Sequence, residues 1–211
     1  MAPPSRRLMM LGALALATPA LAAPKVVDAK KVFPYLDAYL KLPPADRSRF
    51  RLAYTFGRDG RPLTAAVWLV DGAQRQPVPL RADGRAERLP TLAQLERAKV
   101  QVDVDSGVKM SISMSIEATV APAADLDARE LAAALAQAQG GMKKALGVMA
   151  LAMPKLEGLR FHGVTGGEIE LADGRRVALP VVGGFPFYAP AAQPTARRVR
   201  FAKAPSRVEI G

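Results

Sequence analysis

The residues with the most evident chemistry are a group of cations near the C-terminus. They are Arg197, Arg198, Arg200, Lys203 and Arg207. The alternation from Arg197 to Ala202 predicts a terminal strand with Arg198 and Arg200 on one face and Val199 and Phe201 on the other. Because guanidinium groups match phosphate and carboxylate, we interpret the five as candidate ligands for an anionic group or lipid surface. The simpler interpretation is that charges on a terminal strand prevent edge-to-edge association.

His162 is the only histidine, which excludes metal sites built from several histidines. Glu168 or Glu170 could orient it as a base, but no nearby serine has the features of a nucleophile. A half-buried strand histidine is therefore the expected role. A hydrolase is the least favoured of the functions considered below.

Two further patterns fail as catalytic or metal motifs. Ser106 and Lys109 have the S-x-x-K spacing of penicillin-recognising enzymes, but the accompanying S-D-N and K-T-G elements are missing and Ser106 lies in a predicted turn. The stretch from Asp103 to Asp105 begins like a calcium loop, yet its twelfth position is Met114 rather than an acid. No catalytic residue is predicted.

Methionine is the remaining candidate metal ligand. Met110 and Met114 are four strand residues apart, roughly 13 Å, which is too far to share one ion. Met149 and Met153 are one helical turn apart but belong to an apolar stripe, where core packing is the expected use. No metal site and no cofactor are predicted.

The clearest structural signal is an unbroken alternation from residue 108 to 120. The apolar members are Val108, Met110, Ile112, Met114, Ile116, Ala118 and Val120. The polar members are Lys109, Ser111, Ser113, Ser115, Glu117 and Thr119. This period predicts a strand with one core face and one solvent face, so Glu117 is expected in water. A turn at 105–107 should join this strand to an alternating strand at 100–104 as one long hairpin.

A long helix is predicted after Asp125. Its apolar stripe consists of Leu131, Leu135, Ala138, Met142, Leu146, Met149 and Met153. Gly140 and Gly141 interrupt it at a cost of about 1 kcal/mol each, so a kink or a junction of two helices is the alternative. Because the stripe keeps its phase, we favour one helix with a weak point that ends before Pro154.

The segment 51–90 has the pattern of an antiparallel meander. Its short apolar runs are separated by Asp-Gly pairs, which suit tight turns. Pro77 and Pro79 lack backbone donors and predict an edge strand. Asp-Gly-Arg occurs at 59–61, 83–85 and 173–175, which we interpret as recurrent turn chemistry rather than duplication.

Short helices flank this meander, and strands follow the long helix. Residues 32–41 predict a helix with Pro34 in its first turn. A second helix begins at Thr91, without a full capping box. After residue 159 the strand pattern returns to the C-terminus. The fold class is therefore α+β, a mainly antiparallel sheet of meander and long hairpin packed against one long helix.

The first 22 residues predict a cleavable signal peptide. A basic start with Arg6 and Arg7 precedes a short apolar run and a small-x-small site, with cleavage after Ala22 or Ala23. The run is too short for a membrane span, and no later stretch approaches the length needed. The expected mature protein is one exported periplasmic domain, 23–211, with a secondary division into 23–105 and 106–211.

Charge and cysteine content narrow the classes of partner. Removing Arg6 and Arg7 from the net charge of +11 leaves +9. Such a charge attracts anionic lipid or acidic polymers, although an arginine-rich surface also arises without a binding role. The chain has no cysteine, which excludes disulfides and a lipid-modified cysteine.

These observations order the functional hypotheses. The first is a non-catalytic periplasmic binding or accessory protein for an anionic or amphiphilic envelope component, with a groove between helix and sheet or a basic face. The alternative is a structural module that binds another envelope protein. Nucleic acid is disfavoured because a signal peptide is present and no recognition helix or stacking motif is found.

Overall fold

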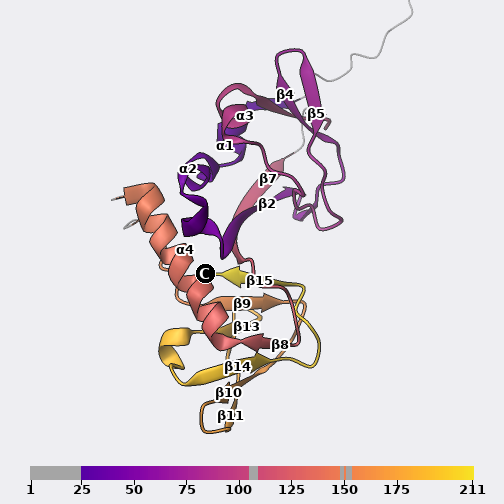
Figure 1. The fold of residues 1–211 in the computed structure, drawn as a ribbon. Helices are drawn as coiled ribbons and strands as arrows, with labels where there is room; N and C mark the ends of the chain where they lie inside the picture. The colour runs from indigo at the N-terminus through magenta and orange to yellow at the C-terminus, as the bar shows by residue number, and fades with distance from the viewer. Residues whose placement is uncertain (1–24, 105–108, 148–149, 151–153) are drawn as a thin grey trace, which may run out of the picture.

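The computed structural model describes residues 25–104, 109–147, 150 and 154–211. The predicted signal peptide, the turn at 105–107 and Met149 and Met153 lie outside the described residues. The predicted α+β class is confirmed, because three antiparallel sheets accompany one long helix (Figure 1).

The described residues of the N-terminal half form three short α-helices and seven strands. They are β1 (Lys25–Asp28), α1 (Ala29–Val32), α2 (Leu36–Lys41), the 3-10 helix η1 (Pro44–Arg47), β2 (Phe50–Arg58), β3 (Arg61–Pro62), β4 (Val67–Asp71), β5 (Gln74–Pro77), α3 (Leu92–Arg97), β6 (Lys99–Val102) and β7 (Met110–Ala118). One sheet has the order β1-β6-β4-β5. The other strands of this half, β2, β3 and β7, join a sheet shared with the C-terminal half.

The C-terminal half contains the long helix and the remaining strands. They are β8 (Asp125–Asp127), α4 (Ala128–Leu146), β9 (Leu159–His162), β10 (Glu168–Leu171), β11 (Arg176–Ala178), β12 (Val181–Val182), β13 (Phe185–Tyr188), the 3-10 helix η3 (Pro190–Ala192), β14 (Ala196–Arg200) and β15 (Arg207–Ile210). The second sheet has the order β11-β10-β14-β8. The shared sheet has the order β12-β13-β9-β15-β7-β2-β3.

The two halves repeat one topology. The sheet order β1-β6-β4-β5 corresponds strand for strand to β8-β14-β10-β11, and the antiparallel pair β2–β7 corresponds to β9–β15. Helices α1 and α2 take the place of α4, and both helical segments start with Asp-Ala, at Asp28 and Asp127. Equivalent backbone hydrogen bonds follow this correspondence. Val78 donates to Val67 as Leu179 does to Gly167, each at 2.8 Å.

An approximate two-fold rotation relates the halves. Strands β7 and β15 are equivalent, yet they pair antiparallel in the shared sheet, with Glu117 opposite Glu209. Each of these glutamates also lies opposite an arginine, Arg51 on β2 and Arg160 on β9. The rotation axis therefore passes through the pair of glutamates, and the four residues form a row across the sheet.

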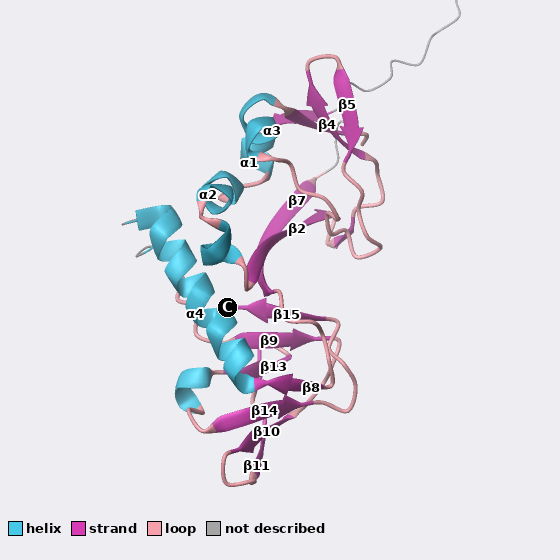
Figure 2. Ribbon diagram, in the orientation of Figure 1, coloured by secondary structure: helices cyan, strands magenta, loops and turns pink. Residues whose placement is uncertain are grey.

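Helix α4 covers one face of the shared sheet, and strands of both halves lie along it (Figure 2). It continues through Gly140 and Gly141 without a break, so the prediction of one helix is confirmed. The predicted end before Pro154 is wrong. The helix stops at Leu146, because Gly147 has a φ of 55° that a right-handed helix does not allow.

The predicted hairpin of strands 100–104 and 108–120 is wrong. Strand β6 pairs with β1 and β4, whereas β7 pairs with β2 over nine positions and with β15. Pairing with β2 sets Ile116 opposite Leu52, and both side chains are buried in the core. Strand β6, which is adjacent in the chain, does not supply this partner. The predicted meander is likewise split, because β2 and β4 belong to different sheets. The predicted edge strand is confirmed, since β5 ends its sheet.

Two predicted helix ends also differ from the structure. The helix predicted at 32–41 begins only at Leu36, as α2, so Pro34 lies before it and not in its first turn. Helix α1 ends at Val32, and the chain turns before α2 at Tyr35, which has a φ of 65°. Helix α3 does have a full capping box, in which Thr91 and Gln94 exchange side-chain and backbone hydrogen bonds. The prediction overlooked Gln94 at the third helical position, where Gln completes a capping box as well as Glu does.

The Asp-Gly-Arg triplets occupy positions that the two-fold rotation does not relate. Triplet 173–175 connects β10 and β11, a place taken by Asp71 and Gly72 in the first half. Gly60, Gly84 and Gly174 all have positive φ. The triplets therefore reflect turn chemistry, and the repeat is visible only in the topology.

Candidate functional site: a buried carboxylate among arginines

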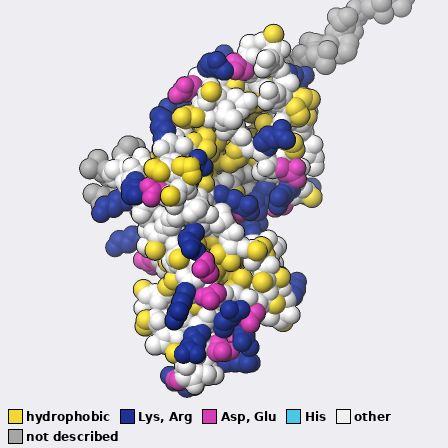
Figure 3. All heavy atoms as spheres, in the orientation of Figure 1, with side chains coloured by type: hydrophobic (Ala, Val, Ile, Leu, Met, Phe, Trp, Pro, Cys, Tyr) yellow, Lys and Arg dark blue, Asp and Glu magenta, His cyan; other side chains and the backbone are white. Residues whose placement is uncertain are grey.

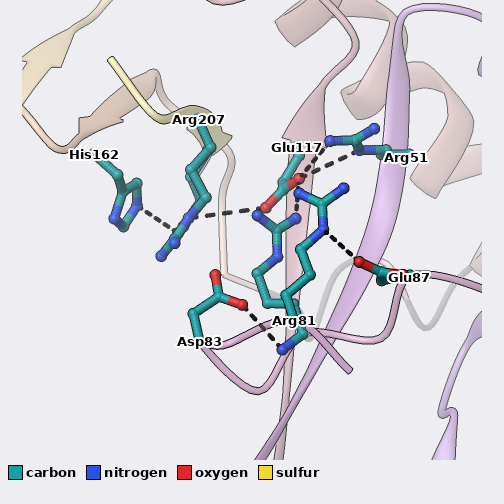
Figure 4. Close-up of polar contacts among 9 residues, drawn as sticks. Arg51, Arg81, Asp83, Glu87, Glu117, His162 and Arg207 are labelled. Carbon is teal, nitrogen blue, oxygen red and sulfur yellow. Dashed lines mark hydrogen bonds and ion pairs between the residues drawn. The ribbon is translucent and has the colours of Figure 1, made fainter. Parts of the chain in front are cut away.

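Glu117 is buried, although the alternation places it on the polar face of its strand. Its relative exposure is 1%. The prediction that it faces water is wrong, because two residues from elsewhere in the chain cover it. Arg85 comes from the loop after β5. Arg207 comes from β15 (Figure 4). The alternation within β7 thus determines which face of the strand Glu117 lies on, whereas residues far away in the chain determine whether that face is buried.

Three guanidinium groups converge on this one carboxylate. Glu117 Oε2 accepts hydrogen bonds from Arg51 Nε at 3.3 Å and Arg51 Nη2 at 3.2 Å, and from Arg85 Nη2. Arg207 Nε lies 3.8 Å from the other oxygen, Oε1. Figure 4 shows Arg51 and Arg207 reaching Glu117 from opposite sides. A buried charge needs such partners, because burial without them is costly.

Two atoms of this group are buried and find no hydrogen-bond partner among the residues that the structure describes. They are Glu117 Oε1, an acceptor, and Arg207 Nε, a donor. The separation of 3.8 Å between them is too long for a hydrogen bond. The site therefore has one unused acceptor beside one unused donor.

The two glutamates on the rotation axis lie directly opposite each other on neighbouring strands. Like charges at this spacing are destabilising unless opposite charges compensate them. Arg51 and Arg160 flank the pair in the register of the sheet, and Arg160 Nη1 lies 3.9 Å from Glu209. The row Arg51, Glu117, Glu209, Arg160 is thus electrically balanced.

His162 lies beside this row and is 8% exposed, more buried than expected for a half-buried strand residue. Its Nε2 is 2.8 Å from Glu209 Oε2, and its ring packs on Phe185 with centroids 4.3 Å apart. The hydrogen bond with His162, followed by the charges of His162, Arg207 and Arg160, lowers the pKa of Glu209 despite its partial burial. The acid beside His162 is Glu209, and neither Glu168 nor Glu170 takes that place.

This lowered pKa predicts a pH dependence of stability. A carboxylate with a depressed folded-state pKa contributes stability that is complete above its unfolded pKa, about 4.3, and is lost as pH falls through the folded value. We expect Glu209→Gln to be less stable than the native chain at pH 6 and the difference to shrink below pH 4. Urea unfolding of both proteins at each pH measures it. A difference that stays constant with pH would contradict the assignment.

The structure separates the five residues predicted as an anion site. Arg198 and Arg200 share a face of β14 with acidic partners: Arg198 Nε is 2.6 Å from Asp125, and Arg200 Nη2 is 3.0 Å from Glu170. The Arg198 hydrogen bond lowers the pKa of Asp125. Arg197 and Lys203 are exposed, and only Arg207 belongs to the Glu117 cluster. The competing interpretation of edge protection is wrong for β14, because it lies between β10 and β8.

Sequence reasoning missed most of the cluster. Arg51, Arg85 and Arg160 stand in segments that read only as strands and turns, and Glu209 as part of a terminal strand. One signal was present at Glu117, the only acid in the alternating stretch from 108 to 120. Its partners could not be found without the pairing of β7 with β2 and β15.

Two hollows flank α4. The one facing the shared sheet is apolar, but its volume of about 30 Å³ has room for little more than a water molecule. A larger open hollow of about 1160 Å³ is lined by α4, by residues 154–157 and by residues 189–192. It borders residues outside the described part, and we assign no site there.

Other ligand classes find little support in the described ranges. No group of three acidic, histidine or cysteine side chains there could hold a metal ion. No helix in this part of the chain has the length and hydropathy of a membrane span. Comparison of the chain with protein-family models, with characterised proteins and with solved structures finds no match.

Proposed function

We propose that this protein is an exported, non-catalytic binding protein for an anionic component of the cell envelope. The observation that carries the proposal is the charge around Glu117, where Arg51, Arg85 and Arg207 meet a single carboxylate. The chain as a whole has a net charge of +11, so long-range attraction favours the same class of ligand. Arg85 is mostly buried against the buried carboxylate of Glu117, so this part of the site is ordered in advance, which reduces the entropy lost on binding.

The cluster is a better anion site than the face of β14. On β14, Arg198 and Arg200 share the carboxylates of Asp125, Asp127 and Glu170, so the acids outnumber the arginines. Figure 3 shows acidic side chains among the basic ones in the lower part of the molecule, where β14 lies in Figure 1. An added anion would have to displace those partners, whereas the Glu117 cluster already has more cations than carboxylates.

Sedimentation with vesicles tests the proposal. The full chain should be retained by phosphatidic acid vesicles at low salt and not by phosphatidylcholine vesicles, and retention should fall with salt because exposed charges are screened. The double variant Arg51→Ala, Arg207→Ala should reduce retention at least tenfold. The control Arg175→Ala, from an exposed pair with Asp173, should not change it.

A second double variant locates the site. If Arg198→Ala, Arg200→Ala removes retention and the cluster variant does not, the ligand binds at β14 and the cluster is the wrong site. Native mass spectrometry of protein purified from the periplasm provides the other readout. No retention together with a bare native mass would contradict the proposed function and favour the alternative, a module that binds another protein.

Three exposed valines favour the alternative function, a module that binds another protein. Val177 lies on β11 and Val181 and Val182 lie on β12, and both strands end their sheets. The equivalent edge of the first half, β5, is Gln-Arg-Gln-Pro. An apolar edge strand is a common place for a partner to add a strand.

A further inference from the structure

We propose that the Glu117 cluster binds a phosphate group that keeps one proton, either inorganic hydrogen phosphate or a singly protonated phosphomonoester. In this arrangement Arg207 Nε donates to an ionised phosphate oxygen, and Glu117 Oε1 accepts from the protonated one. The inference rests on the proposed function and names the chemical class of its ligand.

The two-fold relation separates structural charges from added ones. The row Arg51, Glu117, Glu209, Arg160 obeys the rotation and is balanced by itself. Arg207 and Arg85 do not obey it. By the pairing of β15 with β9 and of β7 with β2, Arg207 corresponds to Ser115. These two arginines therefore add two positive charges to a row of four residues that is already neutral.

The counterpart of Arg85 follows from the backbone. Glu87 donates to Pro79 as Phe187 donates to Pro180, each at 2.8 Å. Glu87 and Phe187 are therefore equivalent under the rotation. Two residues earlier in each half, the equivalent of Arg85 is Phe185, which is uncharged. The asymmetric charge is thus concentrated at the Glu117 end of the row.

Nearby acids only partly offset this charge. Glu87 pairs with Arg81 at 3.7 Å, which leaves that pair neutral. Asp83 accepts the backbone N–H of Arg85 at the turn, so one of its oxygens is occupied. Counting Asp83 in full, the asymmetric residues still contribute one net positive charge.

The unused atoms specify the ligand further. A group that satisfies both must accept a hydrogen bond from Arg207 Nε and donate one to Glu117 Oε1. Hydrogen phosphate does both. Sulfate, an ionised carboxylate and a phosphodiester have no proton to donate, so their oxygens would meet Glu117 Oε1 as an unpaired like charge.

Access to these atoms is through the outer arginines. The side chains of Arg51 and Arg207 are 54% and 30% exposed, whereas that of Arg85 is 11% exposed and that of Glu117 is 1% exposed. Glu117 and Arg85 thus form the floor of the site. Rotation of the two long outer side chains exposes it, and their free N–H groups can then close over the phosphate.

Isothermal titration of the full chain with inorganic phosphate and with sulfate, at equal ionic strength and pH 7, tests the inference. We expect phosphate to bind at least tenfold more tightly than sulfate. Glu117→Gln keeps the shape but supplies an amide donor, so the preference should fall to within about threefold while sulfate binding strengthens. Arg175→Ala should leave both affinities unchanged.

Equal affinity for the two anions, or no phosphate binding, would overturn the inference. If vesicle retention persists in that case, the proposed function stands without it. If Glu117→Gln does not fold, as judged by thermal unfolding, Arg207→Ala replaces it and must lower phosphate affinity at least tenfold. Phosphatidic acid vesicles that compete with inorganic phosphate, when phosphatidylglycerol vesicles do not, identify a lipid phosphomonoester as the source.

Discussion

Glu117→Ala should destabilise the protein by about 3–5 kcal/mol, because it leaves Arg51, Arg85 and Arg207 without the buried carboxylate that they share. Arg85 is the most affected, since its side chain is mostly buried and cannot simply turn to water. Urea unfolding at pH 7 measures the loss as a lower midpoint with an unchanged slope.

The matched control is an exposed ion pair. Asp173→Ala removes a carboxylate 2.6 Å from Arg175, with both side chains more than half exposed, and should cost far less stability than Glu117→Ala. If Glu117→Ala costs no more than this control, the three guanidinium groups do not depend on Glu117, and the cluster is not an organised site.

Gly141→Leu should destabilise the protein by about 3 kcal/mol, whereas Gly140→Leu should stabilise it by up to about 1 kcal/mol. A Cβ on Gly141 would lie 2.7 Å from Phe50 Cζ, because α4 packs closely on β2 there. A Cβ on Gly140 meets no described residue within 4 Å, so the gain in helix propensity is the expected effect.

Thermal unfolding of both variants measures the difference. For a chain of this size, 1 kcal/mol corresponds to a shift of about 2–4 °C in Tm. The same substitution at neighbouring positions should therefore move Tm in opposite directions. Shifts of the same sign would show that the contact with Phe50 does not limit what residue 141 can be.

Local patterns predicted the elements better than their partners. The alternation around Ile116 identified β7, and the phase of the apolar stripe carried the helix across Gly140 and Gly141. Both signals lie within a few residues. The pairing of β7 with β2 and β15 depends on the burial of segments far away in the chain, and no local period contains that information.

The repeat shows the same limit. Arg51 and Arg160, like Glu117 and Glu209, become equivalent only when the strand register is known. The three Asp-Gly-Arg triplets, which are easy to see, are unrelated by the rotation. The candidate site was missed for this reason, since its residues meet only in the shared sheet.

Two identical subunits around a two-fold axis must place the same residue on both sides of it. This protein surrounds its axis with one polypeptide, so Arg207 can stand where the other half has Ser115, and His162 where it has Ala53. A homodimer of either half would offer two equal half-sites. The single chain instead presents one unequal cluster of charges at the axis, so the proposed site occurs once in the described part of the molecule.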